Sequence, residues 1–328
     1  MGTSYLVRAI GLEGIEPAAL QEELDARLEE INAAMSTWRD DSEISAFNEA
    51  FSTDWVEVSA DFHAVVRTAL AVSEATDGGF DVTIEPLIRL WGFSDRGEAS
   101  EPPPPEDIEK AMAQIGWHKL KVDDASPRIR KTDPELTINL SAIAKGYGVD
   151  AIADVIEHHG GERYLVEIVG EIRVNGLNVD DEPWQIGVER PDVGGRVVQE
   201  VIPLTLGGVA TSGDYRNYFE KDGVRYSHII DPRQGAPIQH RVAAVTVIGE
   251  TAMIADAWAT ALLVEGFDRG FSLAQENDIG ALFLVRDESS DGFAEVMTPL
   301  FSVAVEQNDP FMPAEGEGAK KSDGGGGH

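Results

Sequence analysis

The sequence predicts a mixed α+β fold with largely antiparallel sheets. Helical and strand-like segments follow one another through short turns, without the regular strand–helix–strand alternation that builds a parallel sheet. The tripeptide "KDG" at 221–223 is typical of a hairpin, which joins antiparallel strands. No segment repeats at the fixed period of a solenoid. Strands are expected at 4–10, 163–176, 184–190, 197–213, 225–232, 241–249 and 281–287.

Helices are expected where apolar residues recur at intervals of three and four. One helix opens at Pro17, a residue suited to a first helical turn, and carries a stripe from Leu20 to Met35. Another follows Ser59 and ends near Gly78. A third covers 141–158, and a fourth begins after Thr251, a good N-cap. The proline-rich stretch at 101–107 is interpreted as a stiff surface loop.

The composition excludes several classes of function. The chain has 328 residues, of which 26 are Lys or Arg and 59 are Asp or Glu, giving a formal net charge of −33. Such a surface repels nucleic-acid phosphates and is typical of a highly soluble protein. The absence of cysteine excludes disulfides and thiolate metal sites. No apolar run is long enough to span a bilayer, and no signal peptide is recognisable before the first strand-like segment.

The segment "LSAIAKGYGVD" at 140–150 has the features of an anion site. Ser141 can cap the helix, whose free N–H groups attract anions, and Lys145 adds positive charge at the same end. Two glycines in the first turns, Gly146 and Gly148, weaken a helix and indicate close approach of a ligand to the backbone. The alternative is an ordinary amphipathic helix with a solvated lysine.

The segment at 75–93 contains a second candidate site. Gly78 and Gly79 allow a sharp turn or a close ligand, and Phe80, next to Asp81, can stack on a flat ring. The alternative is a helix C-cap that leads into a core phenylalanine.

Two further segments hold titratable groups. His228 and Asp231 lie at the end of a short strand, where acid–base residues are frequent, and the alternative is a surface histidine. Asp256 and Thr260 are four residues apart, so both oxygens share one face of a largely apolar helix. A carboxylate, a hydroxyl and waters suit Mg²⁺, and the alternative is an aspartate that is hydrogen-bonded within the core.

Taken together, these segments resemble the ApbE family of FAD:protein FMN transferases. The resemblance covers about residues 1–303, and eight motifs occur in register. They are "MGTSYLVR", "MSTWRDDSEISAFN", "TDGGFDVTIEPLIRLWGF", "LSAIAKGYGVD", "YLVEIVGEIRVNG", "ATSGDYRNYF", "RYSHIIDPRQGAPI" and "TAMIADAWATALL".

The resemblance implies a T-fold-like architecture and a Mg²⁺-dependent transfer of FMN from FAD to a Thr or Ser hydroxyl of a target protein, with release of AMP. The implied targets are subunits of sodium-translocating NADH:quinone reductases or Rnf-type redox complexes. The implied location is the periplasm, at the inner membrane, through a lipid anchor on a cysteine upstream of this sequence.

The resemblance also implies roles for individual residues. His228 is the expected general base, and Asp256 is the second candidate for that role. The metal ligands are expected to be Asp256, Thr260 and the backbone carbonyl of Ala144. The expected flavin contacts are Met1, Trp38, Gly79, Phe80, Asp81, Ser141, Lys145 and Ile230.

Two other functions remain open on the sequence. The same residues would serve a Mg²⁺-dependent FAD pyrophosphatase, which forms FMN and AMP, and a flavin-binding protein without catalysis would also retain FAD. We expect one catalytic domain over residues 1–307 and a disordered tail at 308–328, where all periodicity is lost.

Overall fold

A computed structural model describes residues 3–94, 101–191, 197–287 and 292–307 of the chain. The predicted contact Met1 and the predicted tail at 308–328 lie outside these residues. None of the helices within the described ranges is long and apolar enough to cross a membrane.

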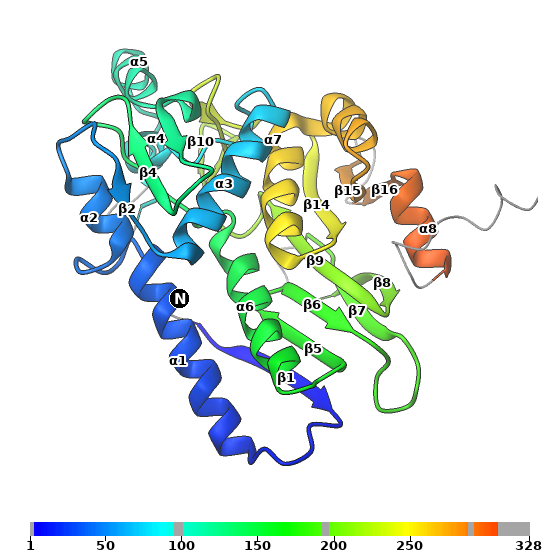
Figure 1. Ribbon diagram of the computed structural model, residues 1–328. Coiled ribbons are helices and arrows are strands. Elements are labelled where there is room, and N and C mark those ends of the chain that lie inside the picture. Colours follow the sequence, from blue (N-terminus) through cyan, green and yellow to red (C-terminus); the bar gives the residue numbers. More distant parts are fainter. Residues whose placement is uncertain (1–2, 95–100, 192–196, 288–291, 308–328) are drawn as a thin grey trace, which may run out of the picture.

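A seven-stranded sheet forms the centre of the structure, and every pairing within it is antiparallel (Figure 1). This confirms the α+β class with antiparallel sheets. The strand order is β1 (Tyr5–Ile10), β5 (Arg163–Ile168), β6 (Glu171–Asn175), β9 (Leu206–Gly213), β14 (Val242–Gly249), β15 (Gly280–Arg286) and β16 (Phe293–Met297).

Long helices cover one face of this sheet (Figure 1). Helix α7 (Ala252–Glu276) packs on β9 and β14, while α6 (Ala144–His158) packs on β5, β6 and α7. Helix α1 (Pro17–Met35) lies against α6, with Pro17 in its first turn as predicted. Helix α3 (Ala60–Ala75) packs on α1 and α7, and the Ser59 hydroxyl accepts the N–H of Phe62.

The opposite face is covered by the hairpin β7 (Trp184–Glu189) and β8 (Val198–Leu204), together with α8 (Pro299–Gln307). Successive residues of β5 show the division of the two faces. Leu165 packs with the hairpin cluster, whereas Val166 packs with the α6 cluster. The middle of the sheet is therefore packed between two apolar layers.

Short elements surround one end of the sheet. They are α2 (Glu43–Glu49), β2 (Val56–Glu57), α4 (Glu85–Leu90), α5 (Pro105–Gln114), the 3₁₀ turn Trp117–Lys119, β3 (Leu120–Val122), β4 (Arg128–Lys131), β10 (Tyr218–Lys221), β11 (Val224–Ser227), β12 (Ile230–Asp231) and β13 (Ala236–Pro237). The loop predicted at 101–107 is wrong in its second half, because α5 begins at Pro105, where proline suits a first helical turn.

Candidate functional site

A large cleft, with a volume of about 1430 Å³, opens where the helices, the sheet and the short elements meet. Its walls come from α7, the β5–β6 hairpin, β7, β9 and the segments at 79–89, 139–145 and 228–232. All the predicted site residues line it except Ala144, which directly precedes the lining residue Lys145, and Met1, which is not described. Residues from five separate motifs therefore converge on one space.

Gly146, in the first turn of α6, packs against α7 and does not line the cleft, contrary to the prediction that this glycine lets a ligand approach the backbone. A Cβ on Gly146 would lie 2.3 Å from the carbonyl oxygen of Ala252, so only glycine allows this approach. The buried Asp150 carboxylate accepts the N–H groups of Ala252 and Met253 at 2.9 and 2.8 Å. Helix α6 thus fixes the first turn of α7, which carries Asp256.

The predicted capping role of Ser141 is wrong. The helix begins at Ala144, its N-cap position is Ile143, and no side chain caps it. Ser141 lies exposed in the preceding turn, where its N–H donates to Asn139 Oδ1 at 2.9 Å. Its hydroxyl is therefore available at the cleft wall, ahead of the helix N-terminus.

Lys145 and two buried carboxylates form the charged centre of the cleft. The Nζ of Lys145 lies 2.5 Å from Glu171 Oε1 and 3.3 Å from Asp256 Oδ1. Burial by itself would lower the pKa of Lys145, but the attraction of Asp256 and Glu171 outweighs it and raises that pKa. Burial, reinforced by repulsion from Asp256, raises the pKa of Glu171 to about 7. The ammonium is therefore charged and lies within the cleft, paired with two carboxylates, and its contact with an anion stays a prediction.

Asp256 and Thr260 lie one helical turn apart on α7 and both line the cleft. Asp256 is only 2% exposed, and its Oδ2 accepts the N–H of Gly146 at 3.0 Å. The Thr260 hydroxyl lies 2.8 Å from Ser212 Oγ. The aspartate is thus hydrogen-bonded in the interior, as the alternative interpretation had it, and it also lines the cleft.

The donors at this point of the cleft suit a hard cation. The described ranges contain no group of three or more His, Cys, Asp or Glu side chains that could hold a metal. A metal here would need the Asp256 carboxylate, the Thr260 hydroxyl and a backbone carbonyl, all of them oxygens. Among the described residues, the buried Glu171 Oε2 close by has no hydrogen-bond partner. This oxygen-only set fits Mg²⁺ and does not fit Zn²⁺.

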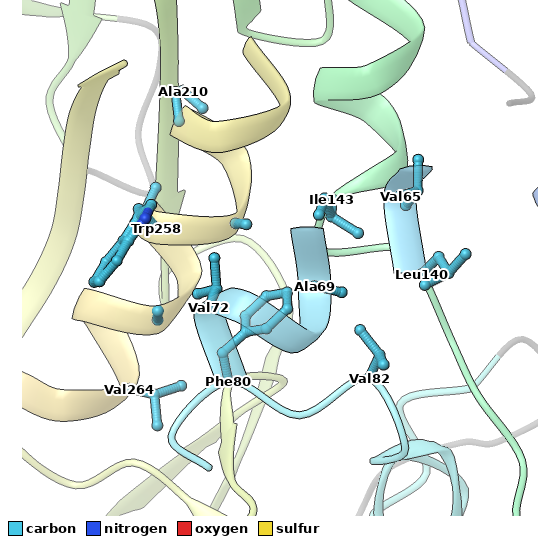
Figure 2. Close-up of a cluster of buried hydrophobic side chains, with 14 of the residues drawn as sticks. Val65, Ala69, Val72, Phe80, Val82, Leu140, Ile143, Ala210, Trp258 and Val264 are labelled. Atoms are coloured by element: carbon cyan, nitrogen blue, oxygen red, sulfur yellow. The ribbon is translucent and has the colours of Figure 1, made fainter. Parts of the chain in front are cut away.

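The loop at 79–82 is organised by its own side chains. Phe80 is 3% exposed and packs with Val72, Val82 and Val264 in the core, as the C-cap alternative had it (Figure 2). Asp81 accepts the N–H groups of Thr83 and Trp117 at 2.8 and 2.9 Å, and burial raises its pKa.

Gly79, in the same loop, has a structural reason to be glycine. A Cβ there would lie 2.1 Å from Oε1 of the buried Glu265. Gly79, Phe80 and Asp81 therefore line the cleft and also hold the loop in its conformation.

His228 lies between β11 and β12 with its ring partly buried at the cleft wall, which favours the acid–base interpretation over the surface-histidine alternative. Its Nδ1 lies 3.1 Å from the carbonyl oxygen of Asn217, which places the proton on Nδ1 and leaves Nε2 as the acceptor. The ring also packs edge-to-face with Phe93. Burial lowers the pKa of His228 below its usual 6.5. At neutral pH this imidazole is a neutral base held in one tautomer.

Asp231, also singled out by its sequence, has a different role. Burial by itself would raise its pKa, but hydrogen bonds from Arg233 outweigh that and lower it. Arg233 also donates to Glu265 Oε1 at 2.8 Å, which ties the turn after Ile230 to α7. Asp231 therefore fixes the turn beside His228 and is not a free acid or base.

Trp38 lies at the mouth of the cleft with its side chain 74% exposed, so a large apolar ring is open to a ligand there. Sequence reasoning missed Glu171, Asp150 and Glu265. Each is a carboxylate in a segment whose sequence points to a different candidate residue. Only the tertiary packing shows that its side chain is buried.

The sequence profile of the ApbE family matches residues 1–283. The chain belongs to the ApbE family. It is 45% identical over 302 residues to the FAD:protein FMN transferase of Vibrio cholerae, covering 92% of this chain and 89% of the relative. It is 38% identical over 312 residues to the protein of the same name from Haemophilus influenzae, covering 93% and 90% of the two chains.

Solved structures of ApbE proteins have the same fold as this chain. The flavin transferase ApbE from Vibrio cholerae superposes with a TM-score of 0.84 at 44% identity, covering 92% of this chain and 96% of that one. The apo form of the flavinyl transferase ApbE from Pseudomonas stutzeri also gives 0.84, at 38% identity and over 93% and 94% of the two chains. The expected ApbE-like architecture is thereby confirmed.

Proposed function

We propose that this ApbE protein transfers FMN from FAD to a Thr or Ser hydroxyl of a target protein, in a Mg²⁺-dependent reaction that releases AMP. The observation that carries the proposal is the convergence of His228, Lys145 and Asp256 on one cleft. Its volume of about 1430 Å³ exceeds the roughly 300–1,000 Å³ of a cleft for one small ligand. A dinucleotide and a segment of the target protein can therefore be held together.

The reaction forms one bond and breaks one bond. The acceptor hydroxyl oxygen bonds to the FMN phosphorus of FAD, and the bond from that phosphorus to the bridging oxygen breaks. AMP leaves with the electron pair of the broken bond, and the product is a phosphodiester between protein and flavin. The acceptor proton goes to the general base.

His228 is the base in this proposal. A threonine hydroxyl is a weak nucleophile, so removal of its proton as the oxygen attacks accelerates the step. The Asn217 carbonyl keeps the accepting Nε2 free, and the lowered pKa of His228 keeps it unprotonated at neutral pH. Asp256 is less suited to this role, because its Oδ2 already accepts the N–H of Gly146 and its Oδ1 faces Lys145.

The ammonium of Lys145 would oppose the negative charge of the diphosphate, which a strongly acidic protein otherwise repels. Asp256, Thr260 and the carbonyl of Ala144 would hold Mg²⁺. The ion would supply charge stabilisation on the phosphate oxygens. The flavin end of the donor would lie toward Trp38 and the loop at 79–81, with Ser141 and Ile230 along the wall.

The proposed targets are subunits of sodium-translocating NADH:quinone reductases or Rnf-type complexes that carry an acceptor threonine. A periplasmic location at the inner membrane, through a lipid anchor, belongs to the same proposal. Both follow from the family resemblance, and identification of flavinylated proteins in periplasmic fractions would test them.

The function is tested by following nucleotides with and without an acceptor. The protein is incubated with FAD and Mg²⁺, and AMP and FMN are separated by chromatography at successive times. We expect AMP to form at a useful rate only when a threonine-containing acceptor is present, with no matching free FMN. Equal rates of AMP formation with and without acceptor would favour the pyrophosphatase. FAD that stays bound and unreacted in the presence of an acceptor would favour a flavin-binding protein.

A further inference from the structure

Glu171 is a buried carboxylate at the charged centre of the cleft to which neither the sequence nor the proposed function assigns a role. Its side chain is 6% exposed, and its Oε1 lies 2.5 Å from the Nζ of Lys145. Its Oε2 is buried and has no hydrogen-bond partner among the described residues. A carboxylate left half-satisfied in the interior is costly, which indicates a functional reason for its place.

The turn that delivers Glu171 is itself strained. Val169 and Gly170 join β5 to β6 with φ angles of 53° and 95°. Valine is β-branched, and the left-handed region is a genuine outlier for such a residue. Strain of this kind persists where the surrounding structure over-determines it, and it clusters at functional sites. The hairpin thus holds Glu171 in place despite an unfavourable backbone.

Lys145 lies between two carboxylates but contacts them unequally. Its Nζ is 2.5 Å from Glu171 and 3.3 and 3.4 Å from the two oxygens of Asp256. Asp256 also accepts a hydrogen bond from the N–H of Gly146, whereas Glu171 accepts its hydrogen bond from Lys145. The shorter contact therefore anchors Lys145 to Glu171 and leaves Asp256 more loosely paired.

We propose that Glu171 is a positioning residue that retains the Lys145 ammonium in the cleft when a divalent cation binds Asp256. This inference rests on the cation site of the proposed function. A cation on Asp256 repels an ammonium that lies 3.3 Å from the same carboxylate. With Glu171 present, Lys145 keeps a partner and stays near the donor phosphates. Without it, Asp256 is the one carboxylate of the described residues that still pairs with Lys145, and the ammonium then competes with the cation for Asp256.

The test measures the affinity for Mn²⁺ alone, without flavin, by electron paramagnetic resonance of free Mn²⁺. Glu171→Gln keeps the shape of the side chain and removes its charge. Glu167→Gln is the matched control, because Glu167 lies on the same hairpin and lines the same cleft. We expect Glu171→Gln to weaken Mn²⁺ binding about three- to tenfold more than the control does.

The Lys145→Gln variant distinguishes two ways in which Glu171 could strengthen cation binding. Glu171 could act by holding Lys145, or its charge could attract the cation directly. In the Lys145→Gln background we expect the additional effect of Glu171→Gln to disappear. An equal loss in both backgrounds, or no difference from Glu167→Gln, would overturn the proposal.

The same measurements distinguish an error in the cation site from an error in the role proposed for Glu171. Wild-type protein that binds no Mn²⁺ would overturn the cation site and this inference together. Thermal unfolding verifies that each variant is folded. If Glu171→Gln is not folded, Glu171→Asp is used in its place. The shorter side chain keeps the negative charge but moves the carboxylate away from Lys145. Weaker Mn²⁺ binding by that variant supports the proposal, and unchanged binding overturns it.

Discussion

Replacing His228 with alanine removes the imidazole and leaves the backbone of the β11–β12 connection in place. Among the described residues, the ring hydrogen-bonds to the Asn217 carbonyl and packs edge-to-face with Phe93, and neither contact joins the main layers of the fold. General-base assistance contributes about 10² to 10⁴ in rate, which corresponds to about 2.7–5.5 kcal/mol of barrier. We therefore expect transfer to fall by that factor, while the affinity for FAD changes less than about tenfold.

The pH dependence of the wild-type protein follows from the direction of the His228 pKa shift. Burial lowers this pKa below 6.5, so the neutral base predominates at pH 6.5 and above and the ring becomes mostly protonated only at lower pH. The single-turnover rate should be level near neutral pH and fall as the pH drops through the pKa of His228. This acidic limb should be missing from the residual rate of His228→Ala.

Single-turnover transfer and FAD calorimetry on the same variant separate catalysis from binding. His63→Ala is the control, because His63 is a partly buried histidine on α3 that does not line the cleft. A His228→Ala variant that transfers at close to the wild-type rate would remove His228 from the mechanism. Loss of FAD affinity in proportion to the rate would make it a binding residue.

Three further predictions concern the metal, the donor and the fold. Asp256→Asn should abolish transfer, as should excess EDTA on the wild-type protein, while the far-ultraviolet circular dichroism stays unchanged; full activity in EDTA would contradict the Mg²⁺ assignment. Calorimetry should show tighter binding of FAD than of FMN, because FMN lacks the adenylate; the reverse order would contradict a cleft built for a dinucleotide. Gly146→Ala should destabilise the fold by about 1–3 kcal/mol, because the new Cβ meets the Ala252 backbone. Gly187→Ala, whose Cβ would lie at an ordinary 3.4 Å from Val198, should melt close to the wild-type temperature.

The fold was predictable where the local pattern and the tertiary structure agree. The apolar stripe of α1, the Thr251 cap of α7 and the hairpin at "KDG" depend on neighbours in the sequence, and all are confirmed. The start of α6 was not predictable in this way. Its glycines suggest a ligand, but they accommodate the Ala252 backbone, which lies more than 100 residues further along the chain.

The sequence could predict that the candidate residues lie together, and they do line one cleft, but it could not predict which side chains contact one another. His228, Lys145 and Asp256 carry residue types that suit the chemistry, and the family motifs locate them. No local signal shows that Glu171 lies against Lys145, because the two belong to different elements and meet only in the folded chain. The roles of Phe80 and Asp81 depend likewise on burial, which a polar-looking loop sequence conceals.

Mass spectrometry of an acceptor protein tests the central claim most directly. The protein is incubated with FAD, Mg²⁺ and an acceptor that carries one reactive threonine, and a Thr→Ala acceptor is the control. The account predicts that the acceptor gains one FMN phosphoryl group on that threonine and that one AMP is released for each group transferred. An acceptor of unchanged mass beside accumulating FMN and AMP, or labelling that persists in the Thr→Ala control, would contradict it.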